Sequence, residues 1–435
     1  MQLSTLPALA LAAVLAGSGL VALPAPTYAA DGDYFLCDDL TLDDPPGTDD
    51  SDSVPLGLLG MDRVYDYLDS LGEKPGAGVG VAVLDAGVSR RSNLMTVVDG
   101  MSFTSKPLGT DPADPHGTEV AGLIAAGARP GGKPTGIAPG ARIIDVKVFD
   151  ADQPDQSSGE VGVSTPALIS GLNWVADNAR RLDIGVANVS LAVTPDLDGR
   201  LERAVRRVVA ADVVLVASSG NRPRDEADEL WEAFNSDTGT EVGPGEDAAK
   251  FVWPAGYSDV LAVSTTTAGQ DQYPDPKQIV VANSQTDVAA PSAMSVSVAL
   301  NGGTCRLAEP ATSYSAAEVS GLVALLRAHF PKDTAAQVVA RLERTADGTL
   351  DVPTTLQGKG VVQPFEALTR PLHPTRGGAV TTTAQQTERI RASAPAAEKD
   401  VLAGTRHDAV WWGLLGGGVL VLALLLRPVL ARRRD

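Results

Sequence analysis

The sequence predicts a three-layer α/β domain built around a mostly parallel β-sheet. Short apolar runs rich in β-branched residues alternate along the chain with segments of helical spacing. This pattern is typical of parallel strands joined by right-handed helical crossovers. The runs are apolar almost without interruption, as expected for strands that are buried on both faces. The chain has 435 residues, 44% of them hydrophobic, which is enough for one large or two ordinary domains.

The predicted strands and helices follow one another between residues 79 and 326. We expect strands at Val79–Leu84, Ile143–Phe149, Ile184–Leu191, Val213–Ala217 and Val260–Val263. Asp145 and Lys147 make the second of these the least regular. Helical spacing of the apolar residues predicts helices at Thr118–Ala126, Thr165–Arg181, Arg200–Ala211 and Val319–Leu326.

The composition argues against a nucleic-acid partner and against folds or sites that need many cysteines. The net charge is −19, and a field of that sign repels phosphate backbones, so we expect no nucleic-acid partner. The chain has two cysteines, which excludes a Cys-based zinc or iron–sulfur site and a disulfide-dense scaffold. One disulfide remains open.

The two ends of the chain resemble targeting and membrane segments. Residues 1–30 carry no charged side chain, are largely apolar from Leu6 to Leu23 and end in small residues, which is typical of a secretory signal peptide. Only the terminal amine is positive there, so a membrane anchor that stays attached is the alternative. Residues 409–426 are uncharged and would reach about 27 Å as a helix, which predicts one transmembrane helix.

The residues around this second segment predict its orientation. Trp411 and Trp412 suit the headgroup region, and the arginines within 427–435 place that tail in the cytoplasm by the positive-inside rule. Everything between residue 31 and about 408 would then lie outside the cytoplasm. A buried core helix at 409–426 is the alternative.

Between the ends, composition separates three regions. Residues 31–54 carry nine Asp and no Lys or Arg, which predicts an irregular, solvated acidic extension. Residues 372–408 are rich in Thr, Gln and Ala without core periodicity, which predicts a stalk. The globular domain is therefore expected at 55–371.

Four residues stand in contexts that suit chemistry. Asp85 ends an apolar strand and Asn221 closely follows another, so both should lie at the carboxyl edge of the sheet, where ligands gather in open α/β folds. His116 precedes an apolar helix, and Ser313 stands at the amino end of a small-residue helix, where free N–H groups can stabilise an oxyanion. Three of them also have an ordinary alternative: a cap or turn former for Asp85, a structural histidine for His116 and an N-cap for Ser313.

The order Asp, His, Ser in these contexts resembles the subtilisin-family serine proteases. The resemblance covers about residues 55–370, and its strongest segments are Val81–Gly87, His116–Gly122, Ala217–Asn221 and Ala311–Gly321. It implies a subtilisin-like fold and a serine endopeptidase that needs no metal or other cofactor.

The resemblance also implies a role for each residue. Ser313 would attack the peptide carbonyl, His116 would take and return the proton, and Asp85 would hold the imidazole in the required tautomer. The amide of Asn221 and the N–H of Ser313 would stabilise the oxyanion. Ser190, Leu191 and Ala192 match the family's strand that pairs with extended substrate.

The order of the segments resembles one branch of the family, the mycosins, which are membrane-anchored proteases associated with type VII secretion in actinobacteria. That resemblance implies a peptide or protein substrate, a location at the cell membrane and a type VII secretion membrane complex as partner. The matching plan is a signal peptide at 1–30, an extension at 31–54, a protease domain at 55–371, a stalk at 372–408, a transmembrane helix at 409–426 and a basic tail at 427–435.

The two cysteines, Cys37 and Cys305, would both be exported to an oxidising compartment, where thiol pairs tend to close. Mycosin amino extensions wrap the catalytic domain, so the resemblance suggests the same pairing. A bridge would tie the acidic extension to the segment before Ser313. Two unpaired or intermolecular thiols remain the alternative, because sequence does not show how close the cysteines lie.

Three residues depart from the common family pattern. Ala86 follows Asp85 where Thr or Ser is usual, Ala311 takes the place of a Gly, and Ala317 takes the place of a Pro. None of these changes deletes a catalytic group. They keep a second hypothesis open, in which the domain is a degenerate protease that serves as a scaffold or binding subunit of a membrane complex.

An acyl hydrolase with a nucleophile elbow is disfavoured, because the chain has no Gly-x-Ser-x-Gly and the residue order differs.

Overall fold

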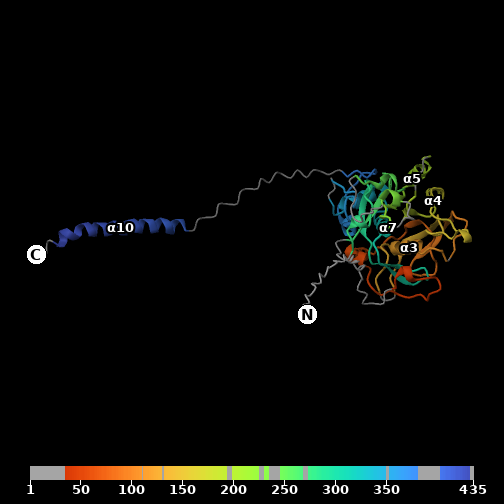
Figure 1. Ribbon diagram of the computed structural model, residues 1–435, viewed down its shortest axis with the longest axis horizontal. Helices are drawn as coiled ribbons and strands as arrows, with labels where there is room; N and C mark the ends of the chain where they lie inside the picture. The colour runs from red at the N-terminus through yellow and green to blue at the C-terminus, as the bar shows by residue number, and fades with distance from the viewer. Residues whose placement is uncertain are drawn as a thin grey trace, which may run out of the picture. The chain divides into compact units, whose positions relative to one another are not determined.

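A sheet of seven parallel strands organises the chain, in the order β2-β3-β1-β4-β5-β6-β7 (Figure 1). The computed structural model describes residues 35–109, 111–129, 132–193, 198–224, 230–234, 245–267, 273–348, 352–380 and 402–431. Internal contacts divide the chain into one unit within residues 1–381 and another within 382–435, and each is described by itself. The expected signal peptide at 1–30, residues 381–401 of the expected stalk and residues 432–435 of the expected tail lie outside the described residues.

The five expected strands are all present, and two further strands lie at the edges of the sheet. The strands are β1 (Gly80–Asp85), β2 (Thr96–Ser102), β3 (Arg142–Lys147), β4 (Ile184–Val189), β5 (Val214–Ser218), β6 (Leu261–Thr266) and β7 (Thr286–Pro291). The edge strands β2 and β7 carry Asp, Gly and Thr or end in Pro, as edge positions tolerate. They therefore lack the uninterrupted apolar run that marks the inner strands.

Helices cover both faces of the sheet, which gives the expected three layers. Helices α3 (His116–Ala125) and α7 (Thr312–His329) pack on one face, and α4 (Thr165–Asn178) and α5 (Arg200–Ala210) pack on the other. Within β1, Val81 and Val83 enter the core beneath α3 and α7, whereas Ala82 and Leu84 enter the core beneath α4 and α5. Both faces of the strand are thus buried, and the apolar run is explained.

Shorter elements complete the first unit. They are the helices α1 (Val54–Leu58), α2 (Met61–Ser70), α6 (Trp231–Phe234), α8 (Ala335–Thr345) and α9 (Pro364–Thr369), the hairpin strands β8 (Ser295–Val298) and β9 (Thr304–Leu307), and the 3-10 turns Cys37–Asp39, Gln156–Ser158, Ala248–Lys250 and Pro276–Gln278. Helix α8 begins with a capping box formed by Thr334 and Gln337. The hairpin packs against α3, and it also receives the start of the chain.

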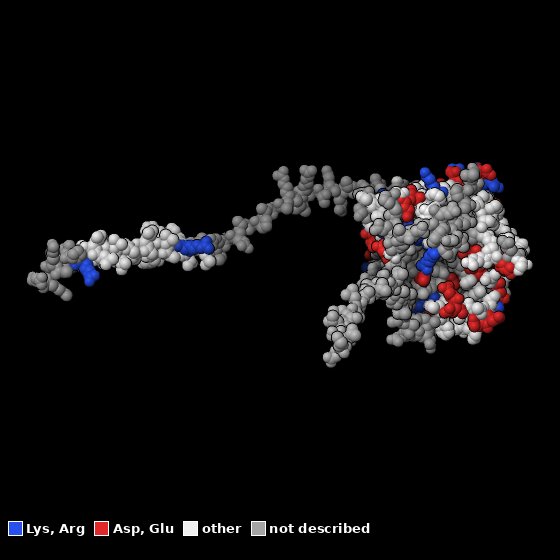
Figure 2. All heavy atoms as spheres, viewed as in Figure 1, with Lys and Arg blue, Asp and Glu red and all other residues white. Residues whose placement is uncertain are grey.

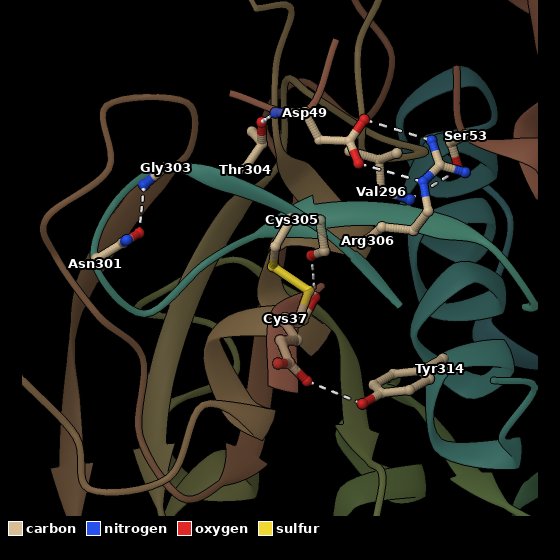
Figure 3. Close-up of a disulfide and its surroundings, with 12 residues drawn as sticks. Cys37, Asp49, Ser53, Val296, Asn301, Gly303, Thr304, Cys305, Arg306 and Tyr314 are labelled. Carbon is tan, nitrogen blue, oxygen red and sulfur yellow. Dashed lines mark hydrogen bonds and ion pairs between the residues drawn. A yellow bond between two sulfur atoms is a disulfide. The ribbon is translucent and has the colours of Figure 1, made fainter. Parts of the chain in front are cut away.

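The acidic extension is docked on this hairpin. Residues 35–53 are mostly irregular and exposed or half-buried, as expected, but Cys37, Asp49 and Ser53 are buried. The Arg306 N–H donates to the Phe35 carbonyl at 2.7 Å, and the Thr304 N–H donates to the Gly47 carbonyl at 3.0 Å. Cys37 forms a disulfide with Cys305, with their Cα atoms 4.9 Å apart (Figure 3). The paired cysteines confirm the expected bridge and exclude its alternatives.

A buried ion pair holds the same contact. The guanidinium of Arg306 lies 3.2 Å from the carboxylate of Asp49, and each side chain is only 3% exposed. Arg306 also donates to the Met294 carbonyl and to the Ser51 hydroxyl. Figure 3 shows Arg306 and Asp49 pointing toward each other beside the bridge. A residue of the acidic run thus serves as an internal counter-charge rather than as a solvated surface group.

The second unit contains one long helix, α10 (Ala403–Ala431). It begins six residues before the expected boundary at Ala409, so His407 lies in this helix and not in the stalk. Within Gly404–Arg427, an 18-residue window has a mean hydropathy of 2.2. In Figure 2 its charged side chains lie near its ends. By length and composition it can cross a membrane, and it is the one described helix that can.

The first residues of the expected stalk belong to the first unit. Gln337 donates to the Pro374 carbonyl and the Thr334 hydroxyl donates to the Arg376 carbonyl, both at 2.8 Å. The docked part of the chain therefore continues beyond residue 371.

Figure 2 shows carboxylates scattered over the visible face of this unit, in keeping with the net charge of −19.

The buried pair predicts a large effect of Asp49→Asn on stability. This change removes the Asp49 charge from beside the buried Arg306 guanidinium, so the free energy of unfolding should fall by about 3 to 5 kcal/mol. Urea unfolding of the full chain in detergent measures this change. Asp62→Asn is the matched control, because Asp62 pairs with Lys133 where both side chains are more than half exposed and exposed pairs contribute little. Equal effects of the two variants would contradict a structural role for the docked extension.

Candidate active site

Asp85 lies at the carboxyl end of β1, the strand at which the order of the sheet reverses. Strand β3 pairs on one side of β1 and β4 on the other, and such switch points form crevices in open α/β sheets. The Asp85 side chain is fully buried. One carboxylate oxygen accepts from the Ala86 N–H at 2.8 Å, and both oxygens lie within 3.1 Å of Nδ1 of His116.

His116 is the first residue of α3, and a glycine lets it come this close to the strand. A Cβ on Gly117 would lie 2.4 Å from the Gly87 carbonyl oxygen and 3.1 Å from the Asp85 carboxylate. Any side chain there would push the first turn of α3 away from β1. The His116 N–H also donates to the Asp114 carboxylate at 2.9 Å, which fixes the start of the helix. Because Nδ1 faces Asp85, the nitrogen left to exchange a proton with another group is Nε2.

The charges around His116 favour its protonated form. Burial lowers the pKa of His116, but the charge and hydrogen bond of Asp85, together with the charges of Glu119 and Asp114, outweigh it and raise the pKa to about 9. The His116 side chain is 26% exposed, so one side of the ring remains accessible. The arrangement suits an imidazole that must accept a proton and hold it as a cation.

Ser313 is the second residue of α7, and the cap position belongs to Ala311. Ala311 has extended backbone angles, φ −145° and ψ 146°, and as the N-cap residue it makes no side-chain cap hydrogen bond. The expected alternative of Ser313 as an N-cap is therefore wrong. The Ser313 carbonyl accepts from the Ser190 hydroxyl at 2.7 Å, and that hydroxyl accepts from the Asn188 amide at 2.9 Å. This chain of bonds ties the start of α7 to the end of β4.

Asn221 is joined to the same helix start. Its Oδ1 accepts from the Thr312 N–H at 2.8 Å and from the Thr312 hydroxyl at 2.9 Å. Since a backbone N–H can only donate, the amide oxygen must face the helix and Nδ2 is directed away from it. Gly220 provides the turn before Asn221 with φ at +114°, a conformation that favours glycine. Asn221 is exposed, so its Nδ2 can donate to a group outside the fold.

The segment Ser190, Leu191 and Ala192 leaves the sheet directly after β4. Ser190 and Leu191 are buried, and Ala192 is half-buried. The next residue, Val193, donates its N–H to the Trp253 carbonyl at 2.8 Å. The segment therefore has a fixed path beside Ser313.

Two side chains of the site were given no role from the sequence. Tyr314 follows Ser313, and its hydroxyl donates to the Glu119 carboxylate at 2.9 Å. The Tyr314 ring centroid lies 5.8 Å from that of His116. The sequence contained one sign of this contact. Glu119 is the single carboxylate in the otherwise apolar segment of α3, and it is buried with the residues around it.

Among the residues that the structure describes, no three His, Cys, Asp or Glu side chains lie together in a way that could hold a metal ion. A cavity of about 720 Å³ lies elsewhere, at the amino ends of the strands, where Val79, Asp183 and Arg327 line it. It has no part in the arrangement around His116.

Comparison with known proteins assigns the sequence to a family. The model of the subtilase family, peptidase S8, matches residues 76–365. Mycosin-4 of Mycobacterium tuberculosis (strain ATCC 25618 / H37Rv) is 30% identical over 381 residues, which cover 82% of this chain and 78% of that protein. Subtilisin BL of Lederbergia lenta is 32% identical over 300 residues, which cover 68% of this chain and 92% of that protein.

Solved structures of two related proteases have the same fold. The MycP3 protease from a type VII (ESX-3) secretion system is 29% identical with a TM-score of 0.57, and the match covers 75% of this chain and 90% of that one. The serine protease MycP1, described as an essential component of the type VII (ESX-1) secretion system, is 25% identical with a TM-score of 0.59 and the same coverage.

Proposed function

The chain belongs to the subtilase family of serine endopeptidases, and from this premise we propose that Asp85, His116 and Ser313 are its catalytic triad. The observation that carries the proposal is the contact between His116 and the buried carboxylate of Asp85, at 3.0 Å. Ser313 supports it, because its place in the first turn of α7 is not explained by helix capping.

In the proposed reaction, Oγ of Ser313 attacks the carbonyl carbon of the scissile peptide bond while Nε2 of His116 takes the hydroxyl proton. Asp85 fixes the tautomer and stabilises the imidazolium that forms. The imidazolium then protonates the leaving amine. In the second half of the reaction His116 takes a proton from water, the water attacks the acyl carbonyl, and His116 returns the proton to Oγ of Ser313. The raised pKa of His116 favours the imidazolium stage of this cycle.

We assign the oxyanion hole to Nδ2 of Asn221 and the backbone N–H of Ser313. Two hydrogen bonds from Thr312 orient the Asn221 amide, so Nδ2 is preorganised and needs no rearrangement when charge develops. The first N–H groups of a helix also carry partial positive charge. Ser190, Leu191 and Ala192 would pair with an extended substrate chain through main-chain hydrogen bonds, which the fixed path after β4 supports.

The three departures from the family pattern do not conflict with activity. Ala311 has an extended backbone that any residue adopts, so a glycine is not required there. Ala317 is buried inside α7, where alanine is the most favourable helix former. Ala86 donates its N–H to Asp85, a bond that the missing hydroxyl does not affect. These points favour catalysis over a scaffold that has lost it.

We further propose that the enzyme is anchored in the cell membrane by α10, with its protease domain outside the cytoplasm and residues 427–435 inside. The signal peptide at 1–30 would direct export. The long apolar stretch Gly404–Arg427 supports the anchor, and the similarity to mycosin-4 covers most of the chain. The likeness to MycP3 and MycP1 supports a type VII secretion membrane complex as the partner.

Ser313→Ala should abolish peptide hydrolysis and labelling by a serine-directed fluorophosphonate, because the variant has no nucleophile. Ser315→Ala is the matched control, since Ser315 lies in the same helix turn and its hydroxyl is occupied by the Ala290 carbonyl. The control should keep both activities. Hydrolysis by Ser313→Ala at the wild-type rate would refute the triad, and an unlabelled wild-type enzyme would favour the scaffold hypothesis.

Asn221→Ala should lower kcat about a hundredfold or more with little change in KM, because one oxyanion donor is lost. Asn221→Asp separates this role from simple loss of structure, since a carboxylate still accepts both Thr312 bonds but cannot donate. Steady-state kinetics should show a loss in both variants. A normal kcat in either one would remove Asn221 from the oxyanion hole.

The orientation predicts which parts of the chain can be labelled from outside. A membrane-impermeant amine reagent should modify Lys133, whose side chain is 58% exposed, in intact cells. An epitope tag fused after Asp435 should stay inaccessible to antibody until the membrane is opened. The reverse pattern would show that the domain faces the cytoplasm.

A further inference from the structure

Helices α3 and α7 are joined by one side-chain hydrogen bond beside the triad. Glu119 lies three residues after His116, so the two side chains share one face of α3. Tyr314 directly follows Ser313 in α7 and donates its hydroxyl to the Glu119 carboxylate at 2.9 Å. Figure 3 draws this bond as the dashed line from Tyr314. The bond thus connects the first turns of the helices that carry His116 and Ser313.

The Tyr314 ring lies beside the imidazole. The two ring centroids are 5.8 Å apart, with the planes tilted by 34°. The ring of Tyr314 therefore restricts rotation of His116 on one side, while Asp85 holds Nδ1 at 3.0 Å. The remaining motion of the imidazole is limited from two directions.

The burial of Glu119 is only partly compensated by hydrogen bonds. The side chain is 2% exposed, and one of its oxygens has no hydrogen-bond partner among the described residues. A buried carboxylate costs free energy unless it is paired, and a phenol is its partner here rather than Lys or Arg. A fold that keeps such a group next to a reactive histidine follows the general rule that local violations gather at functional sites.

The charged groups near Glu119 are Asp38, Asp114 and His116. Burial is the largest influence and, together with Asp38 of the docked extension and Asp114, raises the pKa of Glu119 to about 7, against the opposing effects of His116 and Tyr314. In return, the negative charge of Glu119 contributes to the raised pKa of His116. The two groups therefore influence each other's protonation.

We propose that Glu119 and Tyr314 are positioning residues for catalysis: Tyr314 limits the orientation of the His116 imidazole, and Glu119 anchors the Tyr314 hydroxyl and stabilises the imidazolium by its charge. The proposal rests on the triad proposed above. It assigns separate effects to the two side chains, because a hydrogen bond and a charge can be removed one at a time.

Two conservative variants separate these effects. Tyr314→Phe keeps the ring and the Glu119 charge but removes the hydrogen bond, so kcat should fall about fivefold with KM nearly unchanged. Glu119→Gln keeps an acceptor for the Tyr314 hydroxyl but removes the charge, so the pKa of His116 should fall by about one unit. The acidic limb of kcat/KM should move to lower pH by the same amount, because His116 is then neutral, and able to act as a base, at lower pH.

The titration is measured directly by NMR on the full chain in detergent, with histidine labelled with nitrogen-15. Glu73→Gln is the matched control, since Glu73 lies 2.6 Å from Nδ1 of His329, at the other end of α7. It should leave the His116 titration and the kinetics unchanged. Thermal unfolding of each variant shows whether it is folded, and the NMR titration is repeated on Glu119→Gln in a Ser313→Ala background, where catalysis plays no part.

An unchanged His116 titration in Glu119→Gln, or an unchanged kcat in Tyr314→Phe, would overturn the proposal. Failure of the triad itself would appear differently, as activity that persists in Ser313→Ala. If Glu119→Gln does not fold, Tyr314→Phe alone decides, through its division between kcat and KM.

Discussion

The burial of one carboxylate at the end of the central strand is the constraint on which the rest of the site depends. Asp85 is removed from water, and a carboxylate in that position must be met by hydrogen bonds or charge. The Ala86 N–H and His116 provide them. His116 can do so only because α3 starts directly against β1, and that approach is possible only because residue 117 has no side chain. The position of His116 thus follows from the need to satisfy the buried Asp85 carboxylate.

Sequence patterns predicted the parts of the fold that are decided locally. The inner strands were found because both of their faces are buried, which leaves an apolar run that can be read without knowing the partners. Strands β2 and β7 were missed because edge strands accept Asp, Gly and Pro. The docked extension was missed for a different reason: Asp49 meets Arg306 across 257 residues of sequence, and no local pattern distinguishes that aspartate from its neighbours.

The candidate site shows the same division. The contexts of Asp85, His116 and Ser313 are local, since each stands at the end of a strand or the start of a helix. The hydrogen bonds from Thr312 that orient Asn221, and the contact between Tyr314 and Glu119, join distant segments. Residue type was enough to predict which chemical groups form the candidate site, whereas their orientation could be seen only in the folded chain. Glu119 did give a local sign, because it is a carboxylate in an otherwise apolar helix segment.

The bridge between Cys37 and Cys305 gives the folded chain an unusual covalent topology. It closes most of the domain, including Asp85, His116 and Asn221, into a single ring, and Ser313 follows eight residues after the ring closes. A protease is exposed to cleavage by its own kind, above all in surface loops. One cut at any position between the two cysteines opens the ring but releases no fragment, because both new ends remain attached through the sulfurs. Asp85, His116 and Ser313 then stay within one covalent molecule.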